Sequence, residues 1–181
     1  GDTLLAPKHW DDEPFECIVS NPPYSIKWVG DENPLLINDP RFSPAGILAP
    51  KSKADLAFTM HMLSWLATNG TAAIVEFPGV LYRGGAEQKI RKYLIDNNYI
   101  DTVIQLPANL FFGVGIATCI IVLKKSKKDN ATLFIDASGE LIHEGNKNKL
   151  SDANIARILE EFVAPKEAAP FARLGDNEKN A

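Results

Sequence analysis

The chain has 181 residues, 45% of them apolar, which is enough for one domain with a sizeable core. Its net charge of −4 argues against a freestanding nucleic-acid binder, because non-specific affinity for nucleic acid comes from neutralising phosphates. Two cysteines give no disulfide framework and no apolar run is as long as a membrane span, so we expect a cytoplasmic protein without a membrane partner.

The chain begins at Gly1, and residues 2–5 (Asp-Thr-Leu-Leu) look like the middle of a fold. We therefore expect a fragment of a longer protein. The alternative interpretation of residues 2–5 is a solvated terminus.

Residues 15–20 are predicted to form a buried strand, because valine and isoleucine favour that setting. Asn21-Pro22-Pro23-Tyr24 follows directly. Proline cannot donate to a sheet ladder, so the strand must stop there, and proline also holds the residue before it extended. The sequence predicts a stiff loop that presents an amide, free carbonyls and an aromatic ring.

This loop suits the chemistry of an exocyclic amine such as adenine N6, which is a poor nucleophile because its lone pair is delocalised. Two acceptors for its hydrogens favour a tetrahedral nitrogen that can attack, and the Asn21 side-chain oxygen and the Pro22 carbonyl are such acceptors. Tyr24 offers a stacking face for a base that has left the duplex. The alternative is a diproline turn that only ends a strand.

Residues 26–52 contain many prolines and glycines and show little periodicity, which predicts a long irregular loop. It is either a flap over substrate, with basic residues near phosphates, or a solvated connection; these residues are Lys27, Arg41, Lys51 and Lys53. Cys17 and Cys119 are predicted to be core residues. His61 has no second ligand at metal spacing, so no metal site is expected.

The remaining elements follow from periodicity and capping signals. Ser52 to Asp55 is a Ser-x-x-acid helix start, and the helix is expected to run to about Thr68 and end at Asn69-Gly70. The other predicted elements are strand 71–77, helix 86–96 entered through Gly84-Gly85, strands 99–106, 117–123 and 132–135, a basic turn at 124–128, helix 150–163, and a polar, flexible tail at 166–181. Alternating strands and helices predict an α/β sheet with ligands at the carboxyl ends of its strands.

The Asn-Pro-Pro-Tyr sequence resembles the (Asn/Asp/Ser)-Pro-Pro-(Tyr/Phe) signature of amino-methyltransferases that use S-adenosylmethionine. The order of features from residue 55 to 162 resembles the modification (M) subunits of type I restriction–modification systems. The segments that carry this resemblance are Asp-Leu-Ala-Phe at 55–58, residues 69–75, Tyr-Arg-Gly-Gly-Ala-Glu at 82–87, residues 110–125, and Phe-Ile-Asp-Ala-Ser at 134–138.

The resemblance implies methylation of adenine N6 in DNA, with S-adenosylmethionine as donor. It also implies assembly with a specificity subunit and, for cleavage, with a restriction subunit that is both motor and nuclease. By the same resemblance Asp2 contacts the adenine amino group of the cofactor, Thr3 and Leu4 flank its ring, and Phe111 or Phe112 stacks on the extruded base opposite Tyr24.

The family's glycine-rich cofactor loop and ribose-binding acid would lie before Gly1. Residues 1–165 are therefore expected to be the carboxyl-side part of a Rossmann-like catalytic domain without its first strands, inactive and weak in cofactor binding when alone. Two other functions stay open: amide methylation of a glutamine in release factors, and a non-catalytic assembly module that docks a partner through its basic turn and terminal helix.

Overall fold

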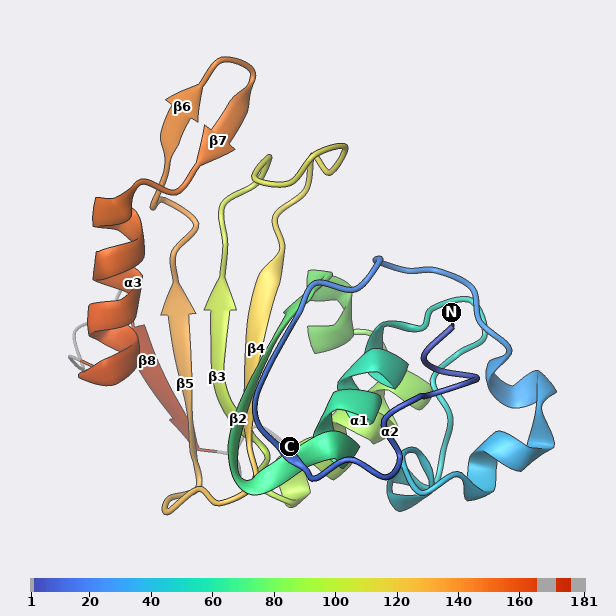
Figure 1. The fold of residues 1–181 in the computed structure, drawn as a ribbon. Coiled ribbons are helices and arrows are strands. Elements are labelled where there is room, and N and C mark those ends of the chain that lie inside the picture. Colours follow the sequence, from blue (N-terminus) through green and yellow to red (C-terminus); the bar gives the residue numbers. More distant parts are fainter. Residues whose placement is uncertain (1, 166–171, 177–181) are drawn as a thin grey trace.

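A computed structural model describes residues 2–165 and 172–176 (Figure 1). Its centre is a six-stranded sheet in the order β1-β2-β4-β3-β5-β8, with a separate two-stranded hairpin of β6 and β7. The strands are β1 Phe15–Ser20, β2 Leu66–Glu76, β3 Ile100–Gln105, β4 Cys119–Lys124, β5 Ala131–Asp136, β6 Ile142–Glu144, β7 Lys147–Lys149 and β8 Ala172–Asp176; the α-helices are α1 Asp55–Trp65, α2 Ala86–Asp96 and α3 Asp152–Val163.

Four strands of the sheet run in one direction. β1 pairs with β2 in parallel, as β3 does with β5, while β4 lies antiparallel between β2 and β3, and β8 is antiparallel to β5. The carboxyl ends of β1, β2, β3 and β5 therefore meet at one edge, where an α/β sheet places its ligands. The predicted α/β class is confirmed.

Helices cover both faces of the sheet. Val103 of β3 belongs to the hydrophobic cluster that includes α1 and α2, whereas the next residue, Ile104, belongs to the cluster that includes α3. Successive residues of a strand point to opposite faces, so α1 and α2 lie on one side and α3 on the other, as Figure 1 shows. None of the helices within residues 2–165 and 172–176 has the length and apolar character that crossing a bilayer requires.

The predicted bounds of the first helix are wrong at both ends. Its N-cap position is Ala54, not Ser52, because the Asp55 carboxylate turns away to bond the amide of Ser25. The chain leaves the helix at Leu66, which already pairs with Phe15 of β1. Gly70 lies inside β2 rather than closing the helix, and a Cβ there would meet the Phe15 carbonyl oxygen at 2.9 Å. Contact between strands thus overrides the helix-ending signal.

The segment from residue 26 to 54 contains three short 3-10 turns instead of longer elements, as its composition predicts: Gly30–Glu32, Pro34–Asn38 and Ser43–Ala45. It is nevertheless packed, because Leu36, Phe42 and Leu48 are buried in the cluster under α1 and α2. Its action as a flap over substrate stays a prediction.

Three further differences concern the edges of the molecule. Within the predicted tail at 166–181, residues 172–176 form β8, and the rest lies outside the described residues. The β6–β7 hairpin carries no strong sequence signal. Cys119 is buried as predicted, but Cys17 is exposed because β1 is an edge strand of the described sheet.

Candidate active site

The Asn21–Tyr24 corner lies at the carboxyl end of β1, on the edge where the parallel strands end. Asn21 is exposed, Pro22 is buried and anchors the corner, and Tyr24 is half-buried. The Tyr24 hydroxyl donates a hydrogen bond of 2.8 Å to Asn21 Oδ1. An amide oxygen has two lone pairs, so this bond orients the Asn21 side chain and leaves it able to accept a second hydrogen.

The Asp55 carboxylate fixes the far side of this corner. Asp55 Oδ1 accepts a 2.7 Å hydrogen bond from the backbone N–H of Ser25, the residue that follows Tyr24. Ser25 has φ 50°, in the left-handed region that non-glycine residues rarely adopt. Asp55 is 1% exposed. A buried carboxylate thus holds a strained turn directly after the corner, as is common at functional sites.

A second buried carboxyl, Glu76, lies at the end of β2 close to these residues. Thr59 Oγ1 donates a 2.8 Å hydrogen bond to Glu76 Oε1. Burial raises the pKa of Glu76 to about 8, and the Asp55 carboxylate acts in the same direction. Burial, with Glu76 nearby, also raises the pKa of the Tyr24 phenol. Tyr24 therefore keeps its proton at neutral pH and remains the donor to Asn21.

The two predicted aromatic partners lie in different surroundings. The Phe111 ring meets the Tyr24 ring edge to face, with centroids 6.5 Å apart and an interplanar angle of 73°. Phe112 is 90% exposed and lies against Lys147 of β7 instead. The structure thus brings Phe111, but not Phe112, to the corner. A sandwich of parallel rings around a base stays a prediction.

The segment with the predicted cofactor residues is held in place by Arg41. Arg41 is 2% exposed, and its guanidinium donates to the carbonyl oxygens of Thr3 at 3.0 Å and Leu4 at 2.7 Å. It also pairs with Asp39 at 2.8 Å. Asp2 Oδ1 accepts the amide of Leu4 at 2.9 Å, which closes a local turn. Arg41 therefore joins the amino-terminal segment to the loop that carries it, and it is neither a solvated loop residue nor free to bind a phosphate.

His61 of α1 completes this network as a neutral side chain. Its Nδ1 lies 3.1 Å from Arg41 Nη1, and its Nε2 lies 3.1 Å from Thr3 Oγ1. Because a guanidinium only donates, Nδ1 must accept and Nε2 carries the proton. Burial lowers the pKa of His61 to about 4, and the Arg41 charge acts in the same direction. His61 is thus a satisfied structural histidine, as its sequence context predicted.

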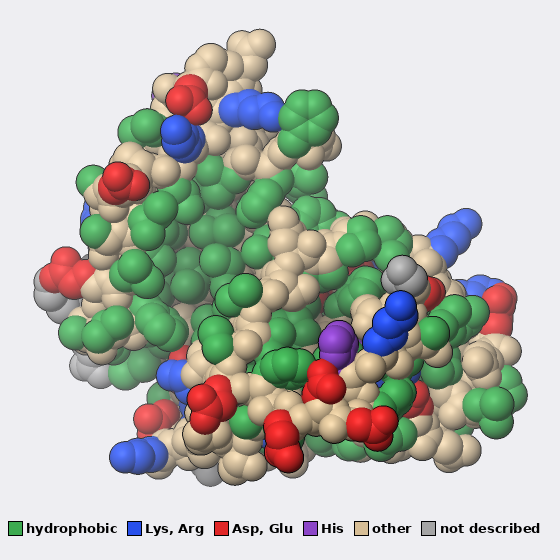
Figure 2. Space-filling view, viewed as in Figure 1, with side chains coloured by type: hydrophobic (Ala, Val, Ile, Leu, Met, Phe, Trp, Pro, Cys, Tyr) green, Lys and Arg blue, Asp and Glu red, His purple; other side chains and the backbone are tan. Residues whose placement is uncertain are grey.

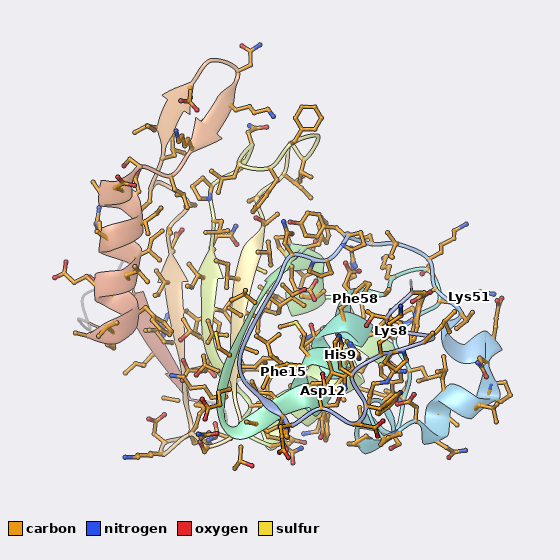
Figure 3. All side chains as sticks on the ribbon, in the orientation of Figure 1. Lys8, His9, Asp12, Phe15, Lys51 and Phe58 are labelled. Atoms are coloured by element: carbon orange, nitrogen blue, oxygen red, sulfur yellow. The ribbon has the colours of Figure 1, made fainter. Side chains whose placement is uncertain are left out.

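A pocket of about 540 Å³ lies between the amino-terminal segment that contains Thr3 and the Asn21–Tyr24 corner. Phe15 and Phe58, both labelled in Figure 3, line it from β1 and from α1. Thr3 of the amino-terminal segment and Pro22 and Pro23 of the corner also line it. Its mainly apolar wall suits one face of a purine ring. The residues present therefore fit the adenosine part of S-adenosylmethionine.

A rigid acceptor corner at the carboxyl end of β1 and a mainly apolar pocket that runs along β1 are features that a methyltransferase catalytic domain requires. The family model described as N-6 DNA Methylase matches residues 1–180. The chain belongs to this family.

Three relatives place it more closely. The methylase subunit of the type I restriction enzyme MpnII from Mycoplasma pneumoniae is 51% identical over 187 residues, which cover 98% of this chain and 34% of that protein. The MjaVIII methylase subunit from Methanocaldococcus jannaschii is 34% identical over 195 residues, covering 99% and 33%. A type I restriction-modification methyltransferase subunit from Streptococcus thermophilus superposes with a TM-score of 0.92 at 44% identity, covering 98% and 38%.

The resemblance to type I modification subunits is therefore confirmed. The chain spans about one third of the length of the curated relatives it matches.

The sequence predicts the corner but neither the Asp55 bond directly after it nor the Arg41 bonds to the amino-terminal segment. The sequence predicts Asp55 as the acidic member of a Ser-x-x-acid helix start capped by Ser52, and it predicts Arg41 in a loop that is either a flap over substrate or a solvated connection. An aspartate at a helix start carries the same signal whether it caps the helix or bonds a distant amide, so the sequence offered no means of distinguishing them. For Arg41, the aspartate two residues before it, which bonds its backbone N–H at 2.9 Å, was the available hint.

Proposed function

We propose that the full-length protein transfers a methyl group from S-adenosylmethionine to adenine N6 in DNA. The observation that carries the proposal is the exposed Asn21 side chain, oriented by the Tyr24 hydroxyl at 2.8 Å, at the end of β1. Membership of the N-6 DNA Methylase family supports the same reaction.

In this proposal Asn21 Oδ1 and the Pro22 carbonyl accept the two hydrogens of the target amine. Pro22 and Pro23 hold both acceptors in place before the base arrives, so little reorganisation is needed at the moment of transfer. Tyr24 stacks on the base and Phe111 closes on its other side. The methyl group passes directly to nitrogen without a covalent enzyme intermediate.

S-adenosylmethionine supplies the methyl group when it is bound. Asp2, Thr3 and Leu4 are the residues of this chain proposed to contact its adenine, and the pocket lined by Thr3 and Pro22 is where that ring would rest. The Arg41 bonds to Thr3 and Leu4 hold their backbone groups in position. Weak cofactor binding by the 181-residue chain alone stays a prediction.

The partners we propose are DNA, a specificity subunit that reads its sequence and, for cleavage, a restriction subunit. Because this chain has a net charge of −4, it neutralises few phosphates by itself. A partner would therefore supply most of the phosphate contacts and the readout of the DNA sequence. The cytoplasmic location expected from the two cysteines stays a prediction.

The two alternatives have less support. The family match does not favour release-factor methylation. An assembly module that docks through its basic turn is weakened by that turn's own bonds. Lys125 Nζ donates to the Leu66 carbonyl, and Lys127 Nζ to the Ile100 carbonyl, so both lysines hold the sheet together.

The test is product identification with the full-length subunit and its specificity partner. Radiolabelled S-adenosylmethionine is offered with DNA or with release factor, and the products are digested and separated by mass spectrometry. We expect label in N6-methyladenine alone. Label in glutamine of the release factor, or in cytosine, would contradict the proposal.

A further inference from the structure

The loop between β3 and β4 presents an aromatic ring to solvent beside the corner. Phe112 is 90% exposed, although its neighbour Phe111 packs against Tyr24. Lys147 Nζ lies 4.0 Å from the centroid of the Phe112 ring. Figure 2 shows apolar and basic side chains side by side at the end of the molecule where the β6–β7 hairpin projects.

This projection is structured rather than a loose loop. The Asn148 side chain donates to the Ala108 carbonyl at 2.8 Å, and the Asn148 backbone N–H donates to the Asn109 carbonyl at 3.2 Å. These bonds tie β7 to the loop. Asn109 (φ 57°) and Gly113 (φ 72°) have left-handed backbone conformations and flank the segment that carries the two phenylalanines. The loop that carries the exposed ring is thus bonded to the hairpin.

An aromatic ring beside a cation suits a duplex from which one base has left the stack, because the ring can fill the gap and the cation can bind a phosphate. The gap is bounded by apolar base faces, and proteins that open or bend DNA fill such gaps with apolar side chains. The neighbouring backbone is anionic and binds lysine. Phe112 directly follows Phe111, so the two Cα atoms are about 3.8 Å apart and the projection stands beside the base site.

We propose that Phe112 and Lys147 form a duplex-contact pair, in which Phe112 fills the gap left by the extruded base and Lys147 binds an adjacent phosphate. The inference rests on the proposed function and adds the surface that holds the duplex. We assign the phosphate contact to Lys147 rather than to Lys149 of the same strand. Lys149 Nζ lies 3.5 Å from Glu144 Oε1, whereas Lys147 Nζ lies over the Phe112 ring.

The role of Phe112 is tested with the full-length subunit and its specificity partner on a duplex that carries the target adenine. Phe112→Ala is expected to slow single-turnover methylation of the matched duplex by about tenfold or more, because the gap is left unfilled. On a duplex with a mismatch at the target, where less stacking is lost, the variant is expected to come within about threefold of wild type. Phe112→Trp should keep the wild-type rate on both.

The matched control is Val163→Ala, which shortens another exposed apolar side chain (78% exposed) at the end of α3. It should leave both rates unchanged. An unchanged rate for Phe112→Ala on the matched duplex, or an equal loss on both duplexes, would overturn the gap-filling role.

Lys147 is tested by the salt dependence of DNA binding. Lys147→Ala should reduce the slope of log K against log salt by about 1, the value for one lost phosphate contact. Lys128→Ala removes one exposed lysine from the turn between β4 and β5 and should leave the slope unchanged. Equal slopes for Lys147→Ala and wild type would refute the phosphate contact.

Asn21→Ala in the same assays distinguishes failure of the duplex contact from failure of the proposed methyl transfer. Loss of methylation in Asn21→Ala together with wild-type behaviour of Phe112→Ala refutes only the duplex contact. Methylation retained in Asn21→Ala refutes the acceptor role of Asn21, whereas no N6-methyladenine from the wild-type complex refutes the proposed function itself.

Discussion

Arg41→Met tests the claim that a buried guanidinium positions the amino-terminal segment. Methionine keeps much of the side-chain volume and removes every side-chain donor to Thr3, Leu4 and Asp39, while the backbone N–H of residue 41 still bonds Asp39. Removing one partner of a buried ion pair costs about 3–5 kcal/mol, because the other charge stays buried without its counter-ion. The Asp39 side chain is 14% exposed and regains some water, so we expect the lower end, about 3 kcal/mol.

Hydrogen exchange followed by mass spectrometry measures this cost locally. The Ala6 amide donates to the Asp2 carbonyl at 2.8 Å and reports on the turn that Arg41 holds. A loss of about 3 kcal/mol corresponds to roughly 150-fold weaker protection of the amides in that turn. Lys92→Met breaks an exposed pair with Asp96 and should cost at most about 0.5 kcal/mol, with no effect there. Protection within twofold of wild type in Arg41→Met would refute the reasoning.

Three further predictions follow from individual contacts. Between pH 4.5 and 8 the folded protein holds more protons on Glu76 than the unfolded chain does, so the contribution of Glu76 to stability falls as pH rises. His61 has the opposite effect, but only between pH 4 and 6.5. Urea unfolding should therefore show the free energy of unfolding falling by about 2 kcal/mol from pH 6.5 to 8. Glu76→Gln should remove that fall, and a fall that persists would contradict it. Gly70→Ala places a Cβ 2.9 Å from the Phe15 carbonyl oxygen and should destabilise by about 1–3 kcal/mol in the same assay, unlike Gly139→Ala, where a Cβ meets open space; equal midpoints would count against the close approach. Tyr24→Phe loses the donor to Asn21 but keeps the ring, so single-turnover methylation by the full-length complex should slow by about two- to tenfold, and an unchanged rate would show that the bond does not orient the amide.

Local chemistry made much of the fold predictable. Proline stops β1 whatever surrounds it, and the predicted helix over residues 86–96 is α2 to the residue. The helix predicted over residues 150–163 is α3, and Ser151 caps it through a capping box whose two halves lie within the same turn. These features depend on residues close together in the sequence, which is why sequence patterns reveal them.

The features that were missed depend on distant partners. β2 begins at Leu66 because β1 pairs with it there. Arg41 is buried because it bonds Thr3 and Leu4, which lie 38 and 37 residues away along the chain. The different surroundings of Phe111 and Phe112 depend on the hairpin, which no local pattern announced. Side-chain chemistry identified the acceptor corner, and only the fold shows what holds it.

The central claim is that Asn21 Oδ1 accepts a hydrogen bond from the target amine. The most direct test compares single-turnover methylation by wild-type, Asn21→Ala and Asn21→Asp full-length complexes, with S-adenosylmethionine affinity measured by calorimetry. We predict that Asn21→Ala loses at least about 100-fold in rate, as when a preorganised hydrogen-bonding group is removed, while Asn21→Asp keeps part of the rate and both bind cofactor like wild type. Methylation by Asn21→Ala at the wild-type rate would contradict the account.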